Sequence, residues 1–142
     1  KLDIFGRAFL AMAFGLLEPN DDTRLQTLLS DITSEAVVSA TGAHWEEAQP
    51  DYYSMNTDTR STAIVIAALS RLQPDNPLVP NAVRWLMAVR QRDRWETTQE
   101  TAWALIGLTD WIVASGELEA DYSWRVLLNG ELLGEGTATR EN

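Results

Sequence analysis

The sequence predicts a mostly α-helical protein, in which α/α-hairpins form part of an α/α toroid and a short β-hairpin follows. Five segments are typical of helices, and they alternate between apolar on all sides and apolar on one face. A weak internal repeat has unequal spacings, which favours a closed toroid over a regular solenoid. After Gly116 the apolar residues change to a period of two, which is typical of strands.

The predicted helices are separated by polar or proline-containing loops. They cover residues 3–17, 23–40, 58–72, 81–90 and 97–113. The first, third and fifth are apolar almost all round, whereas the second and fourth have a single apolar face. Because a helix that is apolar on every side must be covered on every side, we expect these three to form an inner layer behind the other two.

The internal repeat links the loops to the helices that follow them. Residues 62–70 (TAIVIAALS) match residues 101–109 (TAWALIGLT) at a shift of 39, and His44-Trp45-Glu46 aligns with Arg94-Trp95-Glu96 at a shift of 50. Helical hairpins that return through a tryptophan-containing loop are therefore predicted to repeat along the chain.

The last part of the chain predicts a β-hairpin over residues 122–128 and 131–134. Asn129-Gly130 between these runs is a strong turn signal, because both turn positions favour positive φ. We therefore divide the chain into a partial α/α toroid over residues 1–116 and the start of a following β domain over residues 117–142.

Composition excludes several classes of function. The chain of 142 residues has a net charge of −10, which disfavours nucleic acid as a partner. It has no cysteine, so disulfides, thiol nucleophiles and cysteine-ligated metals are excluded within these residues, and its single histidine rules out a multi-histidine metal site. We expect no cofactor and no bound metal.

Two short polar stretches are the candidates for chemistry. His44 with Glu46 and Glu47 could form an acid/base set. The alternative, which the lack of a nucleophile favours, is that Trp45 closes the end of a helical hairpin while His44 caps backbone groups.

The second stretch is Thr98-Gln99-Glu100 in the first turn of the last predicted helix. Thr97 or Thr98 would be the N-cap, Glu100 would complete a capping box, and Gln99 would tie this turn to a neighbouring loop. We expect none of these residues to be catalytic.

A local basic stripe interrupts the acidic composition. It consists of Arg84, Arg90, Arg92 and Arg94. Cations near a helix C-terminus interact favourably with the helix dipole, and a partner-binding patch is the alternative interpretation.

An ordered set of stretches resembles the thioester-containing helical domain of the α2-macroglobulin/complement family. The set comprises FGRAFLAMAFGLLEPND, an amphipathic helix and AHWEE, then DTRSTAIVIAALSRL, then VRWLMAVRQRDRWETTQETAWALIGLTDW. Residues 116–136 resemble the return into the β-sandwich region that follows in this family. The pattern WxxTQExAWAL is most similar to the bacterial branch.

The resemblance implies a role for the chain within a larger protein. Family members are extracellular or periplasmic endopeptidase inhibitors that trap proteases after a bait region is cut, and many use a Cys–Gln thioester. Since this chain has no cysteine, it corresponds to the second half of the helical domain, and we assign it no thioester residue and no enzymatic activity. The positions that match family motifs, His44, Trp45, Glu46, Thr98, Gln99 and Glu100, are expected to be structural.

The resemblance also implies the partners, which are proteases through the full-length parent and neighbouring β domains of the same chain.

Two alternative functions stay open. The first is an enzyme of the triterpene cyclase type, because QETAWAL is similar to the Gln…Trp helix starts of these cyclases, but the clustered aspartates that they need are missing. Zinc-dependent prenyltransferases share the same toroid fold. The second alternative is a toroid module that only binds proteins.

Five helices do not complete a ring, so the inner helices are expected to leave an apolar face uncovered. We expect this face around Phe9, Ile66 and Leu105, and we expect the isolated chain to self-associate through it.

Overall fold

The computed structural model describes residues 2–17, 22–49, 51, 53–116 and 121–139. Its helices are α1 (Ile4–Leu17), α2 (Asp22–Ser34), α3 (Asp58–Leu72), α4 (Leu78–Ala88) and α5 (Thr98–Ser115), and its strands are β1 (Val37–Ser39), β2 (Gly42–His44), β3 (Tyr122–Leu128) and β4 (Glu131–Ala138). The predicted class, mostly helical with a β-hairpin at the end, is confirmed.

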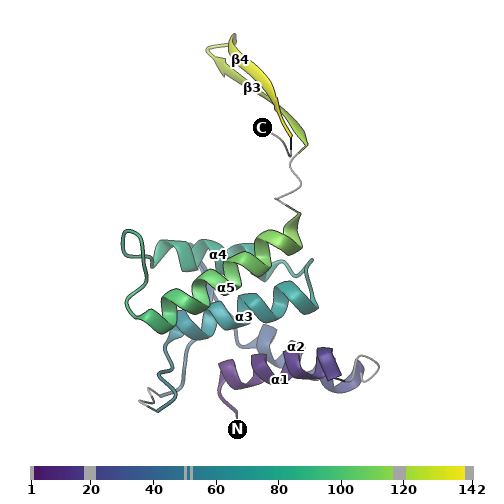
Figure 1. Ribbon diagram of the computed structural model, residues 1–142, viewed down its shortest axis with the longest axis vertical. Helices are drawn as coiled ribbons and strands as arrows, with labels where there is room; N and C mark the ends of the chain where they lie inside the picture. The colour runs from purple at the N-terminus through teal and green to yellow at the C-terminus, as the bar shows by residue number, and fades with distance from the viewer. Residues whose placement is uncertain (1, 18–21, 50, 52, 117–120, 140–142) are drawn as a thin grey trace.

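Helix α3 is the centre of the helical part. It lies between α1 and α5 and also packs against α4 (Figure 1). Every residue from Arg60 to Ser70 is buried, as expected for a helix that is apolar on all sides. Helices α1 and α5 were expected to be covered in the same way, but each has a face open to solvent because only α3 provides them with an inner-layer neighbour.

Two predicted helix boundaries are wrong by three residues or more. Helix α2 ends at Ser34 instead of residue 40, because residues 37–44 form the two-stranded sheet β1–β2. Val37 and Val38 favour this extended conformation. Helix α4 begins at Leu78, three residues earlier than expected, and it includes Pro80, whose missing N–H is tolerated in a first turn.

Two glycines allow close approach of neighbouring elements. Gly42, with φ of +135°, lies against α4, where a Cβ atom would come within 2.3 Å of the backbone oxygen of Asn81. Gly107 on α5 lies against α3, where a Cβ would be 2.6 Å from the backbone oxygen of Ala63. These contacts fix the small sheet on the outer helix α4 and bring α5 against α3.

The C-terminal hairpin has the predicted turn. Asn129 and Gly130 have φ values of +51° and +87°, and β4 continues four residues beyond the expected end at Gly134. The Trp124 indole covers Gly136, where a Cβ would be 2.7 Å from a ring atom. Every residue of β3 is exposed, and the hairpin stands clear of the helices in Figure 1. The proposed division before residue 117 falls where the described helical part ends.

The expected apolar face is present only in part. Leu105 is 57% exposed, but Ile66 is fully buried, which contradicts the expectation for that residue. Phe9 is half-buried and packs edge-to-face on Trp103, with 5.2 Å between the ring centroids. The uncovered face therefore lies on the outer side of α5, where Ile106 and Val113 are also exposed.

Within the described residues, no helix is long and apolar enough to cross a bilayer.

The isolated chain is predicted to self-associate through this face of α5. Replacing Leu105 and Val113 by serine should shift the molar mass from light scattering toward that of the 15.9 kDa monomer. Leu133→Ser, on the exposed β-hairpin, is the control and should leave the helix-mediated association unchanged. A parent chain that is monomeric at high concentration would contradict the prediction.

Candidate functional site

The polar residues at the start of α5 converge on one buried carboxylate. Of the two predicted candidates, Thr97 and not Thr98 is the N-cap of α5. Glu100 N donates to Thr97 Oγ1 at 3.1 Å, and Thr97 N donates to Glu100 Oε2 at 3.0 Å, which forms the predicted capping box. Glu100 is only 3% exposed, so its second oxygen also requires a donor.

That donor comes from another helix. Thr57, the N-cap of α3, donates its hydroxyl to Glu100 Oε1 at 2.6 Å and accepts from Arg60 N at 3.1 Å. One carboxylate therefore completes the first turns of α3 and α5 and holds their N-termini together. The role of Thr57 was not predicted, although a threonine directly before Asp58 at a helix start is a typical N-cap signal.

Thr98 and Gln99 lie beside this carboxylate but point to a different environment. Both are exposed, and the Gln99 side chain makes no hydrogen bond within the described part of the chain, so the expected tie to a neighbouring loop is made by Glu100 instead. Both residues line a hollow of about 370 Å³ at the N-terminal ends of α3 and α5. Its lining residues are Asp51, Met55, Asn56, Thr57, Thr97, Thr98 and Gln99.

The polar groups of Asp51 and Asn56 in this hollow are used in hydrogen bonds within their own loop. Hydrogen bonds from the backbone of Tyr53 and from Ser54 lower the pKa of Asp51, so its carboxylate stays ionised. Asn56 accepts from Asp51 N at 2.6 Å and donates to the backbone oxygen of Gln49 at 2.9 Å. The lining contains no histidine, lysine or arginine to activate a threonine hydroxyl.

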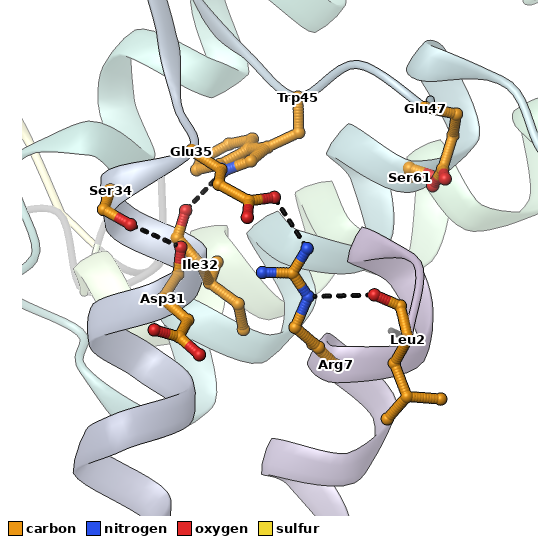
Figure 2. Close-up of polar contacts among 9 residues, drawn as sticks. All are labelled: Leu2, Arg7, Asp31, Ile32, Ser34, Glu35, Trp45, Glu47 and Ser61. Atoms are coloured by element: carbon orange, nitrogen blue, oxygen red, sulfur yellow. Dashed lines mark hydrogen bonds and ion pairs between the residues drawn. The ribbon is translucent and has the colours of Figure 1, made fainter. Parts of the chain in front are cut away.

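Trp45 closes the first helical hairpin. Its side chain is fully buried, and its indole Nε1 donates to the backbone oxygen of Ile32, in the last turn of α2, at 2.7 Å (Figure 2). Its backbone N donates to Thr62 Oγ1 on α3 at 3.0 Å. One residue thus gives the Ile32 carbonyl a second donor, besides the backbone N–H of Glu35, and attaches the loop to the next helix.

Trp95 makes the same two bonds in the second hairpin. Its Nε1 donates to the backbone oxygen of Leu86, in the last turn of α4, at 2.9 Å, and its backbone N donates to Thr101 Oγ1 on α5 at 3.2 Å. Thr62 and Thr101 begin the two segments that match in the internal repeat. The weak repeat therefore corresponds to equivalent hydrogen bonds.

Of the possible acid/base set, the structure brings together only His44 and Glu46. The His44 ring stacks on Trp85 of α4, with 4.5 Å between the centroids and 4° between the planes, and its Nε2 lies 3.3 Å from Glu46 Oε1. Glu47 points elsewhere and accepts a short hydrogen bond from Ser61 on α3. His44 also does not cap backbone groups as expected, because its Nδ1 is buried with no hydrogen-bond partner among the described residues.

An ion pair lies beside the Trp45 closure (Figure 2). Arg7 of α1 is 8% exposed, and its Nη2 lies 2.6 Å from Glu35 Oε2, directly after α2. Its Nε also donates to the backbone oxygen of Leu2 at 3.2 Å. The hydrogen bond to Glu35 raises the pKa of Arg7, so the cation persists and ties α1 to the end of α2. Neither residue was singled out from the sequence.

Within the described residues, no group of three or more histidine, cysteine, aspartate or glutamate side chains is arranged to hold a metal ion.

Neither the protein-family models nor the curated proteins compared with this chain give a match. The resemblance to the α2-macroglobulin/complement family therefore stays a hypothesis that rests on the ordered motifs.

Replacing Glu100 by alanine is predicted to lower the free energy of unfolding by about 2–4 kcal/mol, because two helix caps lose an acceptor in a buried site. Urea denaturation followed by circular dichroism measures this change. Glu96→Ala, at an exposed position in the loop just before α5, is the matched control and should cost less than about 0.5 kcal/mol. Equal effects of the two substitutions would mean that Glu100 does not join the caps.

Proposed function

We propose that this chain is a structural part of an α2-macroglobulin-like endopeptidase inhibitor, which traps proteases after its bait region is cleaved. In this proposal the chain is the C-terminal part of the thioester-type helical domain, continuing into a β domain. The parent would be extracellular or periplasmic, as the resemblance implies.

The observation that carries the proposal is the structural role of two residues that match the family motifs. Trp45 and Glu100 are buried, and their polar atoms are used in joining one helix to the next. A residue with this role contributes rigidity and not reactivity. A large trap that rearranges around a protease needs such rigid parts, so that cleavage of the bait moves whole domains.

The reactive group of the parent, where it has one, would lie outside this chain. A thioester requires a cysteine, and these 142 residues contain none. The chain would then supply half of the helical scaffold that keeps the acyl group away from water until the switch occurs.

The cyclase alternative receives less support from the same residues. A polyene cyclase needs a carboxylic acid that is free to give its proton inside an apolar cavity. Glu100 is the buried carboxylate in the described part of the chain, and both of its oxygens accept hydrogen bonds from threonine groups. Both oxygens are therefore used in hydrogen bonds that join the helix N-termini.

The test uses the full-length parent protein. After incubation with an endopeptidase, gel filtration should show the protease retained with the parent, which should be cut at one region. A retained protease should hydrolyse a small chromogenic peptide but not a folded protein, because the trap excludes large substrates by size.

The comparison variants are Glu100→Ala and Glu96→Ala in the parent. We expect weaker retention for Glu100→Ala and normal retention for Glu96→Ala. A parent that is digested into many fragments without retaining protease would contradict the proposed function.

A further inference from the structure

Four exposed arginines lie in the second half of α4 and in the loop that follows it. This arginine surface consists of Arg84, Arg90, Arg92 and Arg94, all exposed. Residues 84–94 contain these four arginines and one aspartate, so this segment has a net charge of +3 in a chain of −10.

The helix dipole does not explain these arginines. Helix α4 ends at Ala88 and has no basic residue in its last turn, and the dipole effect falls off within that turn. Arg84 donates to Asn81 Oδ1 at 3.0 Å, and Arg90 Nε donates to the backbone oxygen of Arg92 at 2.6 Å. Neither of these hydrogen bonds is to one of the last carbonyl groups of α4.

Ion pairs within the chain do not explain them either. Arg7 pairs with Glu35, and Arg71 pairs with Asp110 at 2.7 Å. None of the four arginines pairs with a carboxylate in the described ranges, although Asp93 and Glu96 belong to the same loop.

The loop holds the arginine surface in a fixed shape. Gln91 N donates to the backbone oxygen of Arg94 at 2.8 Å, and Arg94 N donates to that of Gln91 at 3.3 Å. Arg92 lies in this tight turn with φ of +60°, and Trp95 anchors the end of the turn to α4. A preformed surface of this kind loses less conformational entropy when a partner binds.

We propose that the arginine surface binds an acidic segment of a partner polypeptide. Guanidinium groups match carboxylates in a planar, two-bond geometry, which favours arginine over lysine at such contacts. Met87 and Val89, which are 43% and 36% exposed, offer apolar contact between the charges. Nucleic acid is the weaker candidate, because its long row of phosphates would also meet the acidic remainder of the chain. This inference does not rest on the proposed inhibitor function.

The test measures binding of a fluorescein-labelled oligoglutamate peptide by anisotropy at about 0.15 M salt. At this ionic strength, repulsion from the rest of the acidic surface is screened beyond about 8 Å, whereas direct contacts remain. We expect saturable binding that weakens when salt is raised to about 0.5 M.

The variant combines Arg84→Gln, Arg92→Gln and Arg94→Gln, and Arg90 is kept because it supports the loop. The control combines Gln26→Glu, Thr27→Glu and Ser30→Glu on exposed positions of α2, which changes the net charge by the same amount. The arginine variant should bind at least about tenfold more weakly, and the control should change affinity less than about twofold.

Three results would overturn the proposal. These are no saturable binding by the parent chain, equal losses in variant and control, and tighter binding of a single-stranded oligonucleotide of equal length than of the peptide. Circular dichroism of both variants establishes that each remains folded.

Discussion

The indole N–H groups of Trp45 and Trp95 determine how α2 is joined to α3 and how α4 is joined to α5. Each donates to a carbonyl in the last turn of the preceding helix, and each backbone N–H of the same residue donates to a threonine on the following helix. A buried carbonyl or indole N–H left without a partner costs about 1–3 kcal/mol, so the two bonds specify one loop path. The direction of α3 and α5 follows from these paths.

Once both loops are fixed, the N-termini of α3 and α5 lie next to each other, and a single carboxylate can serve both. Glu100 accepts from Thr97 and Thr57, and Gly107 lets the two helices approach closely. Helix N-termini favour a negative charge, so a buried carboxylate is stabilised at this position. Two of the residues that match the family motifs, Trp45 and Glu100, thus hold the helices, which is why a structural role within a larger inhibitor is the function we propose.

Periodicity predicted all five helices and the C-terminal hairpin, since each depends mainly on its own residues. It extended α2 over residues 35–40, because Ala36 and Val37 continue the helical spacing of apolar residues, whereas the sheet β1–β2 depends on Gly42 meeting α4. The repeat aligned Trp45 with Trp95 and Thr62 with Thr101. It did not reveal that each tryptophan donates a hydrogen bond to the threonine of its own repeat. Contacts between distant residues, such as Arg7 with Glu35 and Thr57 with Glu100, leave no local pattern in one sequence.

Hydrogen exchange of the indole N–H groups, followed by NMR, tests most directly whether the two tryptophan closures organise the fold. We expect the Trp45 and Trp95 indoles to exchange only through unfolding of the helical part, with opening free energies that agree within about 1 kcal/mol. The Trp124 indole, on a hairpin and 44% exposed, should exchange rapidly in the same sample. Exchange of Trp45 or Trp95 at the rate of Trp124 would show that the two closures do not organise the fold, because the corresponding hairpin would then open without unfolding the rest.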